Sequence, residues 1–181
     1  MGLFLEHGYA ATTIPMIAAA SDVSRTSVIR YWGSKSEIVW AEFDRHIDRL
    51  ADKLAQADRR RPVMEVVGDV VVENLGASIA ASAAWLDRFS ILDVAPELRA
   101  EEAEHWQRWA GVVAAYVGER SGQEPGDPTP QAVGGAVQGA FLAFLRQWRD
   151  DPSPGDPLPA LSAVLQPICA ALEALIPPHV A

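Results

Sequence analysis

Apolar residues recur at intervals of three and four along most of the 181-residue chain, and this spacing is typical of amphipathic α-helices. Alanine is frequent, whereas runs that alternate apolar and polar residues, as half-buried strands do, are nearly absent. The pattern therefore predicts an all-α protein. We expect helices over roughly 1–7, 12–20, 24–33, 34–57, 63–82, 84–94, 97–120, 131–149 and 159–176.

Capping residues and helix breakers place several of the helix ends. Gly8 is suited to end the first helix, because glycine readily adopts the left-handed conformation common after a helix C-terminus. The sequence SKSE, which begins at Ser34, has the S-x-x-E form of a capping box and predicts a helix start. The loops SGQEPGDPTP and DDPSPGDPLP are rich in proline, glycine and aspartate. The run ADRRRP, ending at Pro62, separates a small N-terminal segment from a larger one.

The first three predicted helices are short and closely spaced, which is typical of a helix-turn-helix unit. The outward side of the third helix then carries hydroxyl groups and long cations, which can reach base edges and phosphates in a major groove. Helix N-termini capped by Thr13, Ser24 and Ser34 can add backbone amides for phosphates. A small core is expected from Phe4, Tyr9, Ile14, Ile17, Ala18, Val23, Val28 and Trp32. The candidate DNA-binding residues are Thr12, Thr13, Ser24, Arg25, Thr26, Ser27, Arg30, Tyr31 and Lys35.

Charge allows only a local footprint on DNA. The chain has a net charge of −9, with net +1 over residues 1–61 and net −10 over residues 62–181. This acidity argues against indiscriminate nucleic-acid binding, because attraction to phosphates needs a basic face. A small docking surface near the N-terminus remains compatible with it. The alternative from composition is a helical subdomain with a solvated polar face.

The segment LFLEHGYAATTIPMIAAASDVSRTSVIRYWGSKSEIV resembles the DNA-binding segment of the TetR family of bacterial repressors. Asp22 stands where a turn glycine is usual, and Ile29 where a phosphate-binding tyrosine is common, so Tyr31 is a candidate to take over that contact. Met1 falls inside the family's first helix, so either the start is shortened or the natural chain extends further. The residues that match the sequence pattern of the family are Leu3, Phe4, Gly8, Tyr9, Thr12, Thr13, Ile17, Ala18, Val23, Ser24, Ser34, Lys35 and Ile38.

This resemblance implies a TetR-like fold, in which a long helix joins the helix-turn-helix segment to a C-terminal helical bundle. We therefore expect a DNA-binding domain over 1–45 and a ligand-binding and dimerisation domain over 46–181. Small residues recur in PQAVGGAVQGAFLAFLRQW, where glycine costs up to about 1 kcal/mol relative to alanine. Close packing, within the chain or between subunits, would explain them. The resemblance favours a homodimer interface, with candidates Ala132, Gly135, Gly139, Ala143, Leu161, Leu165, Ile168 and Leu172.

The C-terminal segment mixes aromatic and polar residues in a way suited to a largely apolar pocket. For each aromatic residue, an ordinary core position is the alternative. A narrower resemblance, over Trp40–Leu50 and Arg88–Gly122, to actinobacterial regulators of the mycofactocin-system type implies an acyl-CoA or a comparably long apolar effector. It also makes Arg88 and Arg99 candidates for the anionic groups of that effector. The candidate ligand-binding residues are Asn74, Ser78, Trp85, Arg88, Phe89, Trp106, Trp109 and Gln138.

Other functional classes find weaker support. Glu102 and His105 have the E-x-x-H spacing of helical-bundle di-iron enzymes, but no second copy exists, so we expect no metal, no cofactor and no enzyme. The single cysteine favours the cytoplasm, and no apolar run approaches the roughly 20 residues that cross a bilayer. The expected function is a ligand-responsive repressor acting as a homodimer on double-stranded operator DNA. An effector-free DNA-binding dimer and, more weakly, a di-metal enzyme are the alternatives.

Overall fold

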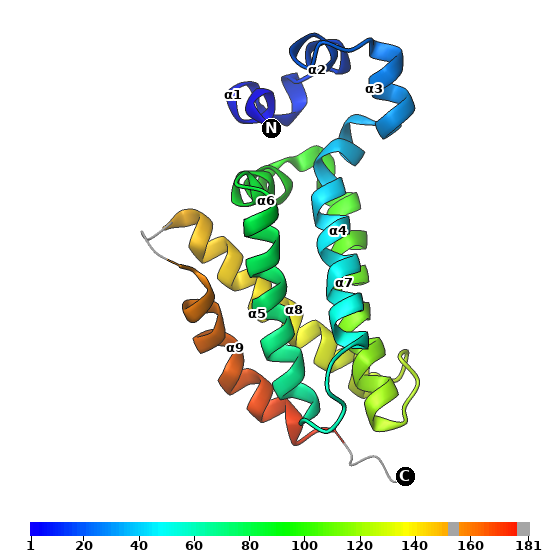
Figure 1. Ribbon diagram of the computed structural model, residues 1–181, viewed down its shortest axis with the longest axis vertical. Helices are drawn as coiled ribbons and strands as arrows, with labels where there is room; N and C mark the ends of the chain where they lie inside the picture. The colour runs from blue at the N-terminus through cyan, green and yellow to red at the C-terminus, as the bar shows by residue number, and fades with distance from the viewer. Residues whose placement is uncertain (152–155, 177–181) are drawn as a thin grey trace.

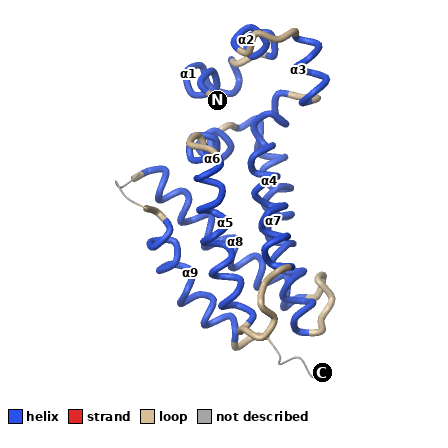
Figure 2. The backbone as a smooth tube through the Cα atoms, in the orientation of Figure 1, coloured by secondary structure: helices blue, strands red, loops and turns tan. Residues whose placement is uncertain are grey.

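The structure, a computed structural model, describes residues 1–151 and 156–176, and within these ranges it contains helices and no strand (Figures 1 and 2). This confirms the predicted all-α class. Apart from α1, the helices begin and end within three residues of their predicted bounds. They are α1 Gly2–Ala11, α2 Ile14–Ala20, α3 Arg25–Trp32, α4 Lys35–Ala55, α5 Val63–Ala81, α6 Trp85–Val94, the 3₁₀ turn η1 Pro96–Leu98, α7 Arg99–Ser121, α8 Pro128–Asp150 and α9 Leu158–Glu173.

Part of the predicted loop DDPSPGDPLP, residues 152–155, and the last residues of the predicted C-terminal domain, 177–181, lie outside the described residues. None of the described helices is by itself long and apolar enough to cross a bilayer. The helices α5 and α6 pass that test only as a pair bent by 107° at their junction.

Helices α1 to α3 form a small head above a bundle of longer helices (Figure 1). Gly8, with φ of +79°, breaks the helical path inside α1, as its sequence position predicted. Asp22 also adopts a positive φ, +53°, in the turn before α3, at the position where the TetR resemblance expected glycine. Ser24 then caps α3, because its hydroxyl accepts a hydrogen bond from the Ser27 amide at 3.0 Å.

The core of the head is smaller than the sequence predicted. Phe4, Ala18 and Val28 are buried, but Val23 is 46% exposed and Trp32 is 36% exposed. The prediction that these two residues belong to the core was wrong. The physical reason is that α3 is only eight residues long and packs mainly against α2, so its far side and both of its ends face solvent.

Helix α4 runs from the head into the bundle and connects the two (Figure 1). Its buried residues recur at intervals of three and four and pack against α5 and α7. Helix α7 lies along α8, and α5 lies along α9. The buried side of α4 consists of Val39, Trp40, Phe43, His46, Ile47, Leu50 and Leu54.

Candidate functional sites

The outer face of α3 has the composition of a nucleic-acid interface. Arg25, Thr26, Arg30 and Tyr31 are all exposed, and Tyr31 reaches 75% exposure. The guanidinium carbon of Arg30 lies 5.3 Å from the centre of the Tyr31 ring, so the two side chains form one platform. Figure 1 shows α3 on one side of the head, where the chain then continues into α4. The structure thus brings these four predicted DNA-binding residues together on one accessible helix.

The hydroxyl groups expected at helix starts serve as caps. Thr13 accepts a hydrogen bond from the Met16 amide at 3.4 Å, and Ser34 accepts one from the Glu37 amide at 3.2 Å. The Ser27 hydroxyl lies 2.9 Å from that of Ser24 and is half-buried. The first amides of α3 and α4 lie near the molecular surface, where phosphates can approach them, whereas α2 has Pro15 in its first turn and so lacks one of these amides.

Two predicted DNA-binding side chains point into the protein instead. Thr12 is fully buried, with its hydroxyl 2.8 Å from the Gly8 carbonyl oxygen. The Lys35 ammonium donates to the carbonyls of Tyr9 at 2.7 Å and Thr12 at 3.0 Å, and it lies 4.1 Å from the Tyr9 ring centre. Carbonyl groups at a helix C-terminus lack intrahelical partners and attract cations. Thr12 and Lys35 therefore fasten the end of α1, and the prediction of DNA contacts for their side chains is corrected.

The aromatic residues predicted for a ligand pocket meet in the bundle interior. Their rings pack against one another and against α4 and α8. Trp106 lies 4.7 Å from Phe43 between ring centres, and Trp109 lies 5.2 Å from Phe141. Trp85 and Phe89 stack at 6.3 Å. All four predicted residues, Trp85, Phe89, Trp106 and Trp109, are buried, which leaves little of their surface open to a ligand in this conformation.

His46, which the sequence analysis did not single out for this role, sits at the centre of these rings and is completely buried. The Trp109 indole N–H donates to His46 Nε2 at 3.2 Å. Indole nitrogen is only a donor, so the imidazole proton is on Nδ1, which lies 2.8 Å from the Ser78 hydroxyl oxygen. The Asn74 amide donates to the His46 carbonyl at 2.9 Å. Burial, with a smaller effect of nearby Arg49, lowers the pKa of His46 to about 3.

This arrangement changes the interpretation of Asn74 and Ser78. Both are fully buried, and the Asn74 amide nitrogen and the Ser78 hydroxyl contact His46, whereas the Asn74 side-chain oxygen has no partner among the described residues. The prediction that they face a ligand is therefore corrected: they hold a neutral imidazole in the core. A signal was present in the sequence, because His46 lies between Phe43 and Leu50 on the apolar stripe of α4.

The remaining two predicted ligand residues lie elsewhere. Arg88 of α6 donates to the carbonyls of Ile38 at 2.8 Å and Val39 at 3.3 Å, so it links α6 to the first turns of α4. Gln138 lines a groove of about 550 Å³ between α7 and α8, together with Trp106 and Arg99. Of the predicted ligand residues, this groove therefore brings together Trp106 and Gln138.

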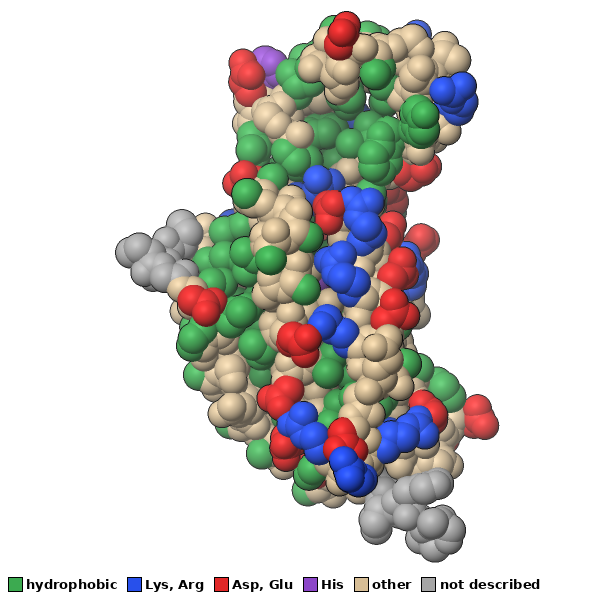
Figure 3. Space-filling model, in the orientation of Figure 1, with side chains coloured by type: hydrophobic (Ala, Val, Ile, Leu, Met, Phe, Trp, Pro, Cys, Tyr) green, Lys and Arg blue, Asp and Glu red, His purple; other side chains and the backbone are tan. Residues whose placement is uncertain are grey.

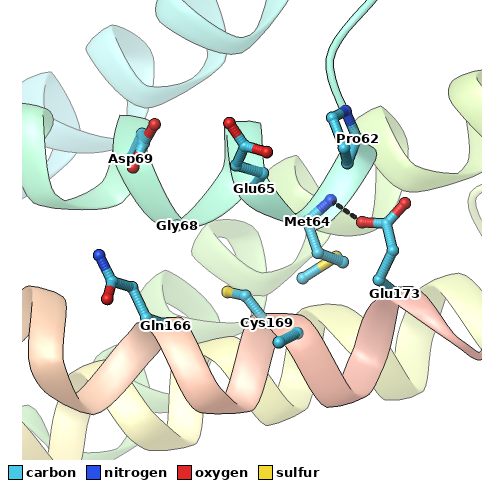
Figure 4. Close-up of a pocket in the computed structure, with 9 residues that line it drawn as sticks. Pro62, Met64, Glu65, Gly68, Asp69, Gln166, Cys169 and Glu173 are labelled. Atoms are coloured by element: carbon cyan, nitrogen blue, oxygen red, sulfur yellow. Dashed lines mark hydrogen bonds between the residues drawn. The ribbon is translucent and has the colours of Figure 1, made fainter.

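Another groove, of about 570 Å³, lies between α5 and α9 (Figure 4). The Glu173 carboxylate closes one end of it and accepts the Met64 amide at 2.6 Å, which caps the N-terminus of α5. Cys169 forms part of the wall, and burial raises the pKa of its thiol to about 11. The thiol is thus protonated and poorly nucleophilic at neutral pH. A third groove, of about 470 Å³, lies between α1 and α6.

The predicted interface residues divide into two groups. Ala132, Gly135, Gly139 and Ala143 lie on the exposed side of α8, and Ile168 and Leu172 are half-exposed on α9. Leu161 and Leu165 are completely buried within the protomer. Their assignment to an intersubunit surface is corrected, because α9 turns these residues toward the bundle rather than outward.

Glu102 and His105, the pair considered for a di-metal site, have different partners. Glu102 is within 3.9 Å of Arg146, whereas His105 stacks on Trp40 at 4.0 Å and lies 2.8 Å from Asp44. Among residues 1–151 and 156–176, no group of three or more histidine, cysteine, aspartate or glutamate side chains could hold a metal ion.

A helix-turn-helix head with an exposed recognition helix, joined by a long helix to a helical bundle, defines a class of bacterial transcription regulators. The chain belongs to the TetR family: residues 1–41 match the profile of the bacterial regulatory proteins of the tetR family. Residues 61–176 match the profile of the MftR C-terminal domain, which assigns the larger segment to one branch of that family. The protein is a TetR-family transcriptional regulator.

Individual relatives agree with this assignment. The chain is 27% identical over 151 residues to the putative mycofactocin biosynthesis transcriptional regulator MftR of Mycobacterium tuberculosis, over 83% of this chain and 76% of that protein. NalD, the secondary repressor of the MexAB-OprM multidrug efflux pump in Pseudomonas aeruginosa, superposes with a TM-score of 0.65 at 19% identity, covering 92% of this chain and 88% of NalD. The TetR-family regulator PfmR of Thermus thermophilus gives 0.55 at 21% identity, covering 91% and 93%. At these identities the two solved structures show the shared fold.

Proposed function

We propose that the protein is a cytoplasmic transcriptional repressor that binds double-stranded operator DNA as a homodimer and releases it when a small apolar effector binds. The observation that carries the proposal is the exposed face of α3, which presents Arg25, Thr26 and Arg30 to solvent on one side of the head. Arginine at this position can read guanine edges, and threonine can contact bases or phosphates. In this proposal residues 1–45 form the DNA-binding domain and residues 46–181 form the ligand-binding and dimerisation domain.

Substitutions on α3 test the DNA-binding part. Arg25→Ala and Arg30→Ala should each cost about 1–3 kcal/mol at a specific operator if the arginine reads a base. A duplex selected by the protein from a random pool provides the operator, and fluorescence anisotropy measures its dissociation constant. Arg60→Ala is the matched control, because Arg60 is an arginine of 90% side-chain exposure in the loop after α4, outside the head. Unchanged operator affinity in both α3 variants would contradict the assignment of α3 as the reading helix.

The exposed side of α8 supports a homodimer. A Cβ atom added at Gly134 would lie 2.4 Å from the Ala110 carbonyl oxygen, so close packing against α7 explains that glycine. At Gly135 and Gly139 an added Cβ meets nothing within 4 Å. Because glycine weakens a helix interior, these two residues are best explained by the close approach of a second subunit. A symmetric pair would place two α3 helices about 34 Å apart, as successive major grooves on one side of DNA require.

Analytical ultracentrifugation tests the dimer. The wild-type chain should sediment as a dimer at micromolar concentration, and Ala143→Glu should shift it to a monomer by placing a charge in the apolar contact. Ala115→Glu is the matched control, because Ala115 is an exposed alanine of α7 outside the proposed interface. A wild-type monomer, or a dimer that survives Ala143→Glu unchanged, would contradict the proposed interface.

The effector part rests on α4, which connects bundle and head. A ligand that prefers a different tilt of α4 shifts the population away from the DNA-binding spacing. An acyl-CoA is one candidate, by similarity to the MftR C-terminal domain. We place the ligand in the groove between α7 and α8, because this groove brings together two of the predicted ligand residues, Trp106 and Gln138. The alternative is that the ligand opens the packed aromatic cluster. Titration of the intrinsic tryptophan fluorescence with palmitoyl-CoA, with free coenzyme A as the control, should give saturable quenching. A flat response would favour an effector-free DNA-binding dimer. The burial of Trp85 and Trp109 supports this alternative, because it leaves little of their surface open to a ligand.

A further inference from the structure

Cationic side chains gather on one face of the bundle, although the chain as a whole is acidic. Figure 3 shows lysine and arginine side chains in a column over α4 and α5, below the head. On α4, Arg45, Arg49 and Lys53 follow one another at intervals of four and therefore share one side of the helix. Arg88 reaches the same helix from α6. This column lies outside α3, so operator reading does not account for it.

The upper part of the column is not neutralised. The Glu42 carboxylate is influenced by all three arginines: a hydrogen bond from Arg45 chiefly lowers the pKa of Glu42, and the charges of Arg45, Arg88 and Arg49 lower it further. Three guanidinium groups around one carboxylate leave two positive charges unbalanced. Within the described ranges, Arg45 and Lys53 form ion pairs, with Glu42 and Glu73, whereas Arg49 and Arg88 form none.

Arg49 and Arg88 also keep hydrogen-bond donors without acceptors. Arg49 donates through Nη2 to the Ser78 hydroxyl at 2.8 Å, and Arg88 donates through Nη1 to the Ile38 carbonyl at 2.8 Å. The Nε–H group of each is buried and has no hydrogen-bond partner among the described residues. Leaving a buried charged donor unpaired is unfavourable, so such a group is expected to have an acceptor when the protein is functional.

We infer that Arg45, Arg49 and Arg88 form a binding site for the phosphate group of a small anionic molecule. Arg88 uses only Nη1, so its Nε–H and Nη2–H remain as two parallel donors, a geometry that matches phosphate oxygens. Arg49 uses Nη2 for Ser78 and keeps its Nε–H as a single unpaired donor. The unbalanced charge supplies the attraction, and the free donors supply the contacts. The site goes beyond operator binding, and it does not depend on it. Because Arg88 already contacts the first turns of α4, a bound phosphate would connect α6 with the helix that carries the head.

Isothermal titration calorimetry with inorganic pyrophosphate tests the site on the full chain at low ionic strength. The wild type should bind pyrophosphate saturably, with one site per chain. Arg49→Gln and Arg88→Gln should each weaken binding by at least about tenfold, because each removes a positive charge and at least one unpaired donor. Arg108→Gln is the matched control: its side chain is 51% exposed, close to the 52% of Arg45, and it pairs with Asp44 on another side of α4.

Arg49 and Arg88 are less exposed than Arg45, and their substitution could prevent folding. Arg45→Gln provides a test of the site in that case. Arg45 pairs only with Glu42 among the described residues, so its loss should leave the fold intact and weaken pyrophosphate binding several-fold. Absence of saturable binding, or equal affinity in wild type and Arg45→Gln, would overturn the site, as would an equal loss in Arg108→Gln. Operator affinity measured without pyrophosphate should be unchanged in Arg45→Gln. A weaker operator complex there would show that the cluster contacts DNA, and would also overturn the inference.

Discussion

The buried His46 predicts a specific loss of stability in mild acid. In the folded chain its imidazole accepts a hydrogen bond from the Trp109 indole N–H and lies against the Ser78 hydroxyl, without access to water. A second ring proton would face the indole N–H and would place a charge in the core. The folded pKa is about 3, against an ordinary value of 6.5. Between these values the unfolded chain binds one proton more than the folded chain, so unfolding becomes easier as the pH falls.

The size of the effect follows from the two pKa values. Above about pH 6.5 the histidine is neutral in both states and its full contribution is present. Below that pH, the free energy of unfolding falls by about 1.4 kcal/mol per pH unit from this group alone. Between pH 7 and pH 5 the loss is about 2 kcal/mol, which is a substantial part of the roughly 5–15 kcal/mol typical of a folded protein.

Urea denaturation at pH 7, 6 and 5, at one fixed protomer concentration, measures this loss. His46→Gln removes the titrating group, so its stability should vary less with pH than that of the wild type by about 2 kcal/mol over this range. His7→Gln, at an exposed position on α1, is the control and should follow the wild type. Parallel wild-type and His46→Gln curves would refute a buried neutral imidazole. If His46→Gln does not fold, NMR titration of the wild-type imidazole should show it neutral down to about pH 4.

Three further substitutions follow from the geometry. Asp22→Gly should raise the free energy of unfolding by up to about 1 kcal/mol, because it removes a side chain from a left-handed turn residue; a destabilised variant would contradict that. Gly134→Ala should lower the free energy of unfolding by about 1–3 kcal/mol through its clash with the Ala110 carbonyl, whereas Gly111→Ala, in open space on α7, should not; urea denaturation compares the two. Lys35→Met should cost about 1–3 kcal/mol and speed amide exchange in α1, whose carbonyls lose their cationic partner.

The sequence predicted the helices well because the start and end of a helix depend on residues that are close together in the sequence. The break at Gly8 and the caps at Ser24 and Ser34 are properties of a few neighbouring residues, and each was visible in the sequence. The exposed residues of α3 were also predictable, since one side of a short amphipathic helix must face solvent. The glycines of α8 were recognised as unusual, but only the structure separates Gly134, which packs against α7, from its outward-facing neighbour.

What the sequence could not predict depends on tertiary partners. Lys35 looked like a phosphate contact until the end of α1 was found within reach of its ammonium group. The polar residues Asn74 and Ser78 looked like pocket groups because their partner, His46, lies far away in the sequence, on another helix. Leu161 lies on an apolar stripe of α9 that could have packed against a second subunit or against the chain's own bundle, and the structure buries it in the bundle. In each case the residue type indicated a special role, but the sequence did not show which residue it contacts.

We propose that the state of the bundle sets operator affinity through α4. Anisotropy of a labelled, selected operator duplex, titrated with the protein in the presence and absence of palmitoyl-CoA, tests this most directly. We expect saturation at two chains per duplex, and an apparent dissociation constant at least about tenfold weaker when the effector is bound, as a coupling of about 1.4 kcal/mol gives. An operator dissociation constant that palmitoyl-CoA leaves unchanged, under conditions where its binding is saturated, would contradict the claim.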